Sequence, residues 1–461
     1  MQTETTLSGG ARTRIEVGRV LDDGSFGRFQ GFVVSLAAGS MIIDGVDSQL
    51  LGIVVPSIMA EWAVPRSAFA PVLAAGFVGM MVGGALAGIG DRIGRRLALI
   101  GSVLLFGVMT LMASMATGLV ALAVLRFFVG VGMQVAAPNA AALVSEYVPA
   151  QYRAVAVTAT VVCIPLGAML AGLLAIPVLP AFGWRGLFVI GGTISIVGAL
   201  VLMRVLPESP RFLARHPSRW NELVGVLARV GHRVPVGAEF VDEAEGGPAR
   251  GSLAALFARA TLVDTLALWS AFFFGLLAVY LGFNWIPSML SGAGYDSTIA
   301  SGGITAYNLG GVVGALTGGL AIRRFGSKVT MMTMAAAAAA AATVTGSIPL
   351  SPDLSSAPLI VMLAVTGAFI NAVQVTLYAL AAHVYPTLSR ATGLGAATSI
   401  GRLGAILSTF AGASALELGG HASFFALVAA AMVAAFISLS VIRRQIPGVN
   451  AAGVTSLSPV S

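Results

Sequence analysis

The chain is dominated by long apolar segments, six before a polar stretch at about 207–260 and six after it. A membrane-spanning helix needs roughly 20 apolar residues, and the segments lie at approximately 29–59, 67–90, 97–116, 118–145, 154–179, 184–205, 261–290, 298–322, 329–349, 356–382, 391–416 and 420–442. Lipid offers backbone groups no hydrogen-bond partner, so such segments must be helical. The sequence therefore predicts an all-α membrane protein with 12 transmembrane helices.

The composition argues against an ordinary soluble enzyme. Only 10% of the residues are charged and 57% are hydrophobic, whereas soluble domains carry about a quarter charged residues. The single cysteine, Cys163, excludes an internal disulfide framework and a cysteine-rich metal site, and the four histidines are scattered. We therefore expect no enzyme active site, no metal and no cofactor.

The basic residues predict the orientation. Most of the 26 Lys and Arg residues fall in the amino-terminal tail, the central polar stretch and alternate short loops, and such residues remain on the cytoplasmic side. Both termini are expected in the cytoplasm, with tails at 1–28 and 443–461, helical halves at 29–206 and 261–442, and a central loop at 207–260. The same distribution accounts for the net charge of +7, so no nucleic-acid partner is implied.

Two motifs recur at a separation of about 235 residues, as parallel six-helix repeats would produce. GDRIGRR at 90–96 corresponds to IRRFGSK at 322–328, and EYVPAQYRA at 146–154 corresponds to HVYPTLSRA at 383–391. One half therefore duplicates the other. This arrangement favours two pseudo-symmetric halves that rock about a central cavity over a rigid channel.

Several strings resemble the major facilitator superfamily over essentially the whole chain: GALAGIGDRIGRR at 84–96, LRFFVGVG at 125–132 and PESPRFL at 207–213. Three others are similar to the aromatic acid:proton symporters of that superfamily: DGVD at 44–47, NWIPSML at 284–290 and YPTLSRATGLGAATSIGRLGAIL at 385–407. The resemblance implies the major facilitator fold in a bacterial inner membrane. It also implies a monomer that imports an aromatic carboxylate, such as benzoate or a hydroxybenzoate, together with protons by alternating access.

Asp44 and Asp47 lie deep in the first span and, at a spacing of three, share a helix face. A carboxylate in hydrocarbon is costly unless it is paired, hydrated or protonated, so movement between two environments can take up and release a proton. The resemblance implies a coupling role for this pair together with Arg126 of the fourth span. A static ion pair with an arginine of another helix is the alternative.

Arg402 lies close to mid-bilayer in the eleventh span. Its guanidinium presents a planar fork that matches a carboxylate, so we expect it to bind the acid group of the substrate while Arg126 partners Asp44 or Asp47. The opposite assignment of the two arginines and a purely structural ion pair both remain open.

An aromatic substrate needs flat apolar walls with a few polar groups. Candidates in the seventh, eighth and tenth spans are Tyr280, Asn284, Trp285, Tyr307, Asn308, Asn371, Gln374 and Tyr378, with Phe283 beside them. In a chain with 23 Phe residues, any single aromatic side chain is more often a packing residue than a ligand.

The resemblance implies that the loop after the second span holds the cytoplasmic side shut, so we expect the paired loops to form a gate rather than a binding site. Its predicted members are Gly90, Asp91, Arg92, Gly94, Arg95, Arg96, Glu146, Arg153, His383 and Arg390. Glycines permit tight turns, and Asp91 can face the positive end of a neighbouring helix. In the second copy Arg323 stands where the acid would be, so an equivalent latch is not expected there.

Three alternative functions remain open. A sugar or polyol porter would share PESPRF, but the seventh span lacks the glutamine pair that holds sugar hydroxyls in such proteins. A proton/drug antiporter would usually carry Gly-Pro in the fifth span, where this chain has Ile164-Pro165. A membrane sensor would bind the acid without accumulating it, so uptake into vesicles separates it from a transporter.

Overall fold

The computed structural model describes residues 14–232, 234–235, 238–242, 257, 261–385 and 390–447, apart from the side chains of Ala154, Arg390 and Ala391. Ten helices in this part of the chain are long and apolar enough to cross a membrane. The first five are α2 (Arg28–Trp62), α3 (Arg66–Leu86), α5 (Arg95–Ala113), α6 (Leu119–Tyr147) and α7 (Ala150–Val205). The others are α11 (Leu262–Gly292), α12 (Ser297–Phe325), α13 (Ser327–Ser347), α14 (Ala357–Val384) and α15 (Arg390–Val441).

Two of these helices are long enough to cross the bilayer twice. α7 has 56 residues and α15 has 52, which at 1.5 Å per residue corresponds to roughly 80 Å each. Each run contains non-helical residues, Gly183 in α7 and the pair Gly419 and Gly420 in α15. Counting each run as two crossings gives twelve, so the prediction of twelve membrane helices in two sets of six is confirmed.

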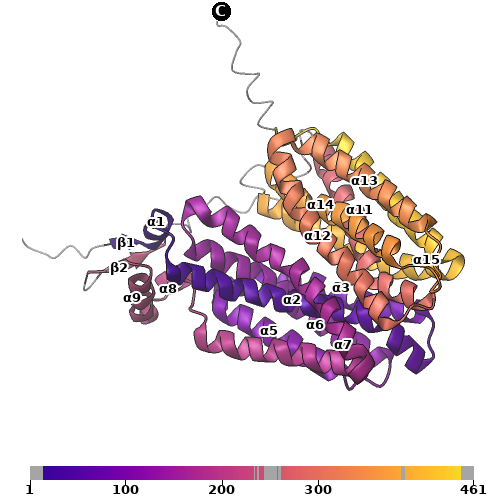
Figure 1. Ribbon diagram of the computed structural model, residues 1–461. Coiled ribbons are helices and arrows are strands. Elements are labelled where there is room, and N and C mark those ends of the chain that lie inside the picture. Colours follow the sequence, from indigo (N-terminus) through magenta and orange to yellow (C-terminus); the bar gives the residue numbers. More distant parts are fainter. Residues whose placement is uncertain are drawn as a thin grey trace, which may run out of the picture.

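The two sets of helices form separate bundles that meet at one end. Within the first half α2 packs on α7 and α3 on α6, and within the second half α11 packs on α15 and α12 on α14. The halves contact each other through α2 and α11, α3 and α15, and α7 and α12. Figure 1 shows the bundles meeting at one end, here named the joined end, and diverging toward the other.

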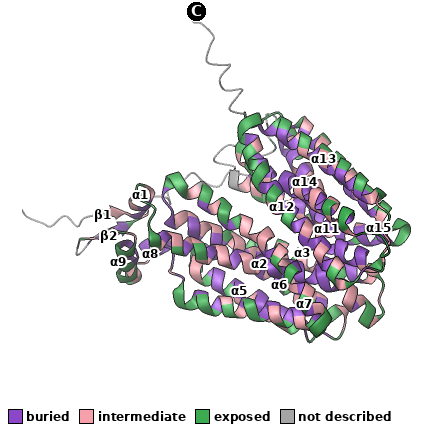
Figure 2. Cartoon of the chain, viewed as in Figure 1, coloured by how far each residue is buried: buried purple, intermediate pink, exposed green. Residues whose placement is uncertain are grey.

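The outer faces of both bundles suit contact with lipid. Large apolar side chains are exposed there, for example Leu320 at 68% and Val313 at 53% on α12. Figure 2 shows the buried residues gathered inside each bundle and the exposed ones along the outer faces of the helices. An apolar outer face around a more polar interior is the arrangement that a bilayer requires.

Short elements cover the first half at its divergent end, here named the capped end. They are β1 (Arg14–Glu16), α1 (Val17–Asp22), η1 (Ala87–Ile89), α4 (Gly90–Ile93), α8 (Pro210–Ala214), η2 (Pro217–Arg219), α9 (Trp220–Arg229) and β2 (Glu239–Val241). β1 pairs in parallel with β2, with Ile15 opposite Phe240. The amino-terminal segment and the central stretch, expected as tail and loop, are therefore partly folded and packed together because each contributes apolar residues such as Leu21 and Leu227 to one cluster.

The internal repeat is visible in the backbone. Gly94 precedes α5 with φ 102° and ψ 144°, and Gly326 precedes α13 with φ 82° and ψ 164°. Positive φ favours glycine because a Cβ would be strained there. The motif correspondence predicted from the sequence thus reflects one turn used twice, at the start of the third helix of each half.

Close glycine-mediated contacts between helices lead to a stability prediction. A Cβ on Gly310 of α12 would overlap the backbone carbonyl of Ala364 on α14, whereas a Cβ on Gly302 of the same helix would meet nothing within 4 Å. Alanine is favoured over glycine in a helix by about 1 kcal/mol, but overpacking costs about 1–3 kcal/mol. Gly310→Ala should therefore lower the thermal midpoint of the detergent-solubilised protein, while Gly302→Ala leaves it unchanged or raises it. Equal midpoints for both variants would contradict this packing.

Candidate functional site

Two buried carboxylates and one arginine lie together in the first half. Asp44 and Asp47 of α2 are 4% and 0% exposed, and Arg126 of α6 is 4% exposed. Asp47 Oδ2 lies 3.9 Å from Arg126 Nη1, and the guanidinium stacks over the ring of Phe188, 4.6 Å from its centroid. The predicted partnership is therefore present, and Asp47 is the acid that Arg126 contacts.

This cluster leaves several polar atoms without hydrogen bonds. Both carboxylate oxygens of Asp47, Oδ1 of Asp44, and Nε and Nη2 of Arg126 are buried and have no such partner within the described chain. Buried polar groups are usually satisfied, and an exception needs an explanation. A carboxylate in such a place can bind a proton or a water molecule, so the site has the chemistry needed to change its charge.

Arg402 of α15 reaches across to the other half. Its Nη1 lies 2.7 Å from Sδ of Met80 on α3, and its Nη2 donates a hydrogen bond to Oε1 of Gln134 on α6. Arg402 interacts electrostatically with Asp44 of the opposite half, but no carboxylate among the described residues forms an ion pair with it. A guanidinium whose close partners are neutral can bind an added anion.

Aromatic rings form a connected series beside these charges. Phe77 of α3 meets Tyr280 of α11 with ring centroids 4.5 Å apart, Tyr280 meets Phe283 at 5.7 Å, and Phe283 meets Tyr307 of α12 at 5.9 Å. All three contacts are edge-to-face, the arrangement that aromatic rings favour. The series crosses from the first half into the second and offers flat apolar faces between them.

The second half adds neutral polar groups to this region. Asn284 Nδ2, Tyr307 OH and Asn308 Oδ1 are buried without a hydrogen-bond partner in the described residues. Asn371 donates to the carbonyl of Gly367 within α14, and Gln374 lies one turn further along that helix. The first half thus holds buried charges, whereas the second half holds mainly uncharged hydrogen-bonding groups.

One aromatic candidate near Arg402 is partly exposed. Tyr378 of α14 is 42% exposed, although its ring meets that of Phe272 with centroids 5.2 Å apart and it interacts electrostatically with Arg402 and Tyr280. The predicted ligand candidates Tyr280, Tyr378 and Arg402 are therefore brought together.

Trp285 is placed differently from the other aromatic candidates. It is fully buried, and its Nε1 donates to the carbonyl of Ser408 on α15 at 3.2 Å. A Cβ on Gly412 would overlap its ring. Trp285 therefore fixes α11 against α15 within the second half.

Several of the predicted gate residues of the first half form one network at the capped end. Arg95 forms ion pairs with Asp91 and with Glu146, the latter at 3.4 Å, and donates to Asn139 Oδ1 at 3.2 Å. A Cβ on Gly90 would overlap the same Asn139 oxygen.

The central stretch docks on this network. Glu208 Oε1 accepts the backbone N–H of Arg96 at 3.0 Å, and a Cβ on Gly94 would overlap the same carboxylate. The hydroxyl of Tyr147 donates to the backbone carbonyl of Glu208 at 2.6 Å. Asp22 of α1 pairs with Arg153.

The remaining gate candidates are exposed or have side chains outside the described residues. Arg92 is exposed on α4, and His383 is exposed in the last turn of α14. The side chain of Arg390 lies outside the described residues. Arg323 is exposed on α12, at the position where the first copy carries Asp91.

Sequence reasoning missed five residues that the structure brings to this region: Gln49, Phe77, Met80, Gln134 and Phe188. The two glutamines could have been identified from the sequence, because an amide inside an apolar span needs a hydrogen-bond partner there. The other three are ordinary core residues by type, so only the fold identifies them.

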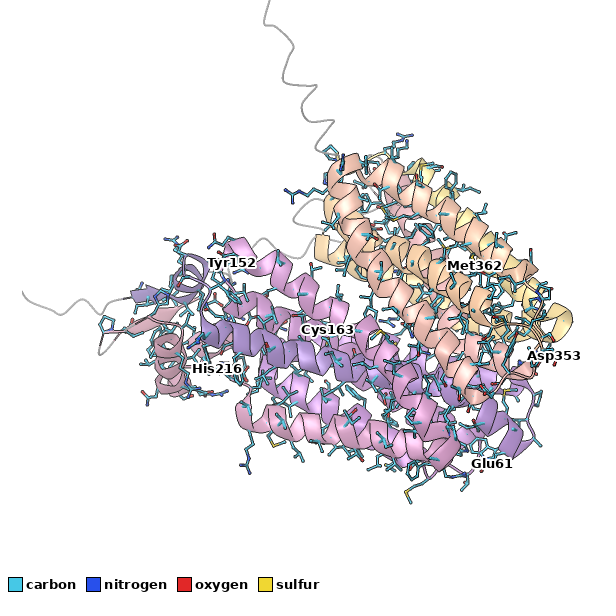
Figure 3. The ribbon with its side chains drawn as sticks, viewed as in Figure 1. Glu61, Tyr152, Cys163, His216, Asp353 and Met362 are labelled. Carbon is cyan, nitrogen blue, oxygen red and sulfur yellow. The ribbon has the colours of Figure 1, made fainter. Side chains whose placement is uncertain are left out.

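Figure 3 relates labelled side chains to this arrangement: Cys163 of α7 lies at the middle of the bundle, Glu61 and Asp353 lie at the joined end, and His216 lies at the capped end.

Among the residues described, no group of three or more His, Cys, Asp or Glu side chains could hold a metal ion.

Comparison with known proteins identifies related chains. Residues 37–305 match the Major Facilitator Superfamily. A 4-hydroxybenzoate transporter of Acinetobacter baylyi is 32% identical over 92% of this chain and 94% of its own length. A gallate transporter of Pseudomonas putida is 32% identical over 88% of this chain and 90% of its own.

Solved structures share the fold at lower identity. The xylose transporter of Escherichia coli, in an inward-open conformation, aligns with a TM-score of 0.72 and 17% identity, covering 93% of this chain and 100% of that one. This similarity supports the fold alone.

The buried Asp47–Arg126 pair leads to a second stability prediction. Arg126→Met leaves a buried carboxylate without its counter-charge, which typically costs about 3–5 kcal/mol, so the thermal midpoint should fall. Adding Asp47→Asn removes that charge and should recover part of the loss. Arg185→Met, which breaks the exposed Glu61–Arg185 pair, is the matched control and should change little, because exposed pairs contribute about 0–1 kcal/mol. A double variant no more stable than Arg126→Met would show that the two charges do not interact.

Proposed function

Because the chain belongs to the major facilitator superfamily, we propose that it is a proton-coupled symporter that imports an aromatic carboxylate by alternating access. The chain is a membrane transporter by family and not an enzyme. The relatives named as 4-hydroxybenzoate and gallate transporters support an aromatic acid as the substrate class. The proposal concerns the coupled ion, the substrate and the residues that bind them.

The observation that carries the proposal is the environment of Arg402. Among the described residues, the hydrogen-bond partners of its guanidinium are the neutral acceptors Met80 and Gln134, and the partly exposed Tyr378 lies near it. An arginine can bind a carboxylate through two parallel hydrogen bonds. Arg402 therefore receives the carboxylate of the substrate, between the two halves.

The aromatic ring of the substrate packs beside the edge-to-face series. Phe77 and Tyr280 supply rings from opposite halves, 4.5 Å apart, and Phe283 extends the surface. Asn284, Tyr307, Asn308, Asn371 and Gln374 provide the neutral polar groups around this surface. Trp285 contributes to this site indirectly, because its hydrogen bond to Ser408 holds α11 against α15.

Proton coupling is assigned to Asp44, Asp47 and Arg126. Asp44 interacts with Arg402 across the interface and with Asp47 along the helix, so it senses both the substrate site and the buried pair. A substrate carboxylate at Arg402 competes with Asp44 for the same positive charge, and protonation of Asp44 removes that competition. Substrate and proton therefore enter together.

The protein is placed in a bacterial inner membrane with its capped end in the cytoplasm. The basic residues Arg92, Arg96 and Arg153 lie at that end, and basic loops remain cytoplasmic. Both termini are then cytoplasmic, and the joined end faces outward. The network around Arg95 acts as the cytoplasmic gate, and the protein functions as a monomer.

Transport into vesicles tests the function. Purified protein in liposomes with an alkaline interior should accumulate labelled 4-hydroxybenzoate above its external concentration, and a protonophore should abolish that accumulation. Asp44→Asn should lose accumulation because the switch cannot change its charge, yet retain exchange of labelled for unlabelled substrate across the membrane.

Binding without accumulation by the unaltered protein would identify a sensor and contradict transport. Full uphill uptake by Asp44→Asn would remove Asp44 from the coupling mechanism while leaving the transport function in place.

Replacement of Arg402 tests the assigned carboxylate site. A hydrogen bond to a charged group contributes about 1.5–3 kcal/mol, so Arg402→Gln should raise the KM for the carboxylate about tenfold or more. Binding of the corresponding aryl amide should be unaffected. Arg323→Gln removes the same charge from an exposed position and serves as the control. If Arg402→Gln transports the carboxylate with an unchanged KM, Arg402 does not bind the substrate.

A further inference from the structure

Gln49 of α2 is bonded entirely to the opposite half of the protein. It is 1% exposed. Its Nε2 donates to the backbone carbonyl of Phe283 on α11 at 2.9 Å, and its Oε1 accepts from Nδ2 of Asn308 on α12 at 3.2 Å. Both bonds cross between the halves near the joined end. They can exist only while the halves are together there.

The carbonyl that Gln49 reaches lacks its usual partner inside α11. In an α-helix the carbonyl of residue i accepts from the N–H of residue i+4, which for Phe283 is Pro287, a residue inside α11. Proline has no backbone N–H. A carbonyl freed in this way within a membrane is tolerated when a neighbouring helix satisfies it, and Gln49 supplies that bond from the other half.

The helices approach closely enough at this point for the bond to form. Gly52 lies one turn from Gln49 on the same face of α2, and a Cβ there would overlap the same Phe283 carbonyl. The absence of a side chain at Gly52 lets α2 pack against α11 at this point. Gln49 can therefore reach the Phe283 carbonyl that Pro287 leaves free.

We propose that Gln49 is a positioning residue for alternating access. By satisfying the Phe283 carbonyl that Pro287 leaves free, it selectively stabilises the conformation in which the joined end is closed. The proposal rests on the transport cycle described above. Each cycle breaks this bond when the joined end opens and remakes it when that end closes, so Gln49 helps to set the populations of the two conformations.

Cysteine accessibility measures opening of the joined end without any substrate. Thr305 of α12 is 9% exposed and lies against Gly172 of α7 across the interface. With Cys163→Ser as background, Thr305→Cys gives a thiol that a hydrophilic maleimide reaches only when the halves separate there. Gln49→Met keeps the side-chain length but removes both bonds, and should raise the labelling rate about tenfold.

Two further variants separate this role from a general effect on packing. Ser48→Ala removes a bond that stays within α2, from Ser48 Oγ to the carbonyl of Gly45 at 2.7 Å, and should leave the rate unchanged. Pro287→Ala restores the N–H that the Phe283 carbonyl lacks. In that background, Gln49→Met should raise the labelling rate by a much smaller factor.

An unchanged labelling rate in Gln49→Met overturns the proposal. An equal increase with and without Pro287→Ala overturns the role of the freed carbonyl. If Gln49→Met is not monodisperse in size-exclusion chromatography, Asn308→Ala removes one of the two bonds and should give a smaller increase that obeys the same criteria. Because labelling needs no substrate, a failure here leaves the vesicle test of transport independent, and a failure of transport leaves this measurement interpretable.

Discussion

Charged and polar groups inside a lipid-facing bundle must be compensated, and this constraint organises the interior of the protein. The outer helix faces can be apolar throughout, so the polar side chains gather where helices face one another. Asp47 and Arg126 compensate each other within the first half. Arg402 has no ion-paired carboxylate among the described residues, and its hydrogen-bond partners are neutral acceptors on the opposite half. The charge at the interface between the halves is therefore the one whose hydrogen-bond partners, among the described residues, are neutral.

Helix α2 is the element through which the acid pair and the interface are connected. Gly45 lets it pack directly on the backbone of α7 at Ile164, and Gly52 lets it pack on the backbone of α11 at Phe283. Asp47 points toward Arg126, whereas Gln49, two residues away and so about 200° around the helix, points toward the second half. These backbone contacts leave no side chains between α2 and its neighbours α7 and α11 at the two glycines.

The parts of this structure that the sequence predicted are those that depend on local composition. The twelve crossings follow from runs of apolar residues, and the pairing of Gly94 with Gly326 follows from a repeated turn that requires positive φ. Asp44, Asp47 and Arg126 stand out because charges are rare in spans. The contacts of Arg402 with Met80 and Gln134, and of Gln49 with Phe283, were not predictable, since they join residues hundreds of positions apart and depend on how the two halves dock. The partly folded cap was missed for the same reason, because β1 and β2 are short and stable only as a pair.

The repeat preserves backbone geometry while its chemistry has diverged. Pro56 and Pro287 lie inside α2 and α11 at equivalent places, and in that register Asp44 and Asp47 correspond to Gly275 and Ala278. At the capped end, the carboxylate of Glu208 holds the start of α5, whereas the start of α13 is held by uncharged groups, the hydroxyl of Ser327 and the backbone of Ile446. Turns and close contacts must match in both halves for the two bundles to dock symmetrically. Charges need not, and the two sides of the interface differ as a result: buried carboxylates lie on the side of α2, and Arg402 with neutral and aromatic groups lies on the side of α11 and α15.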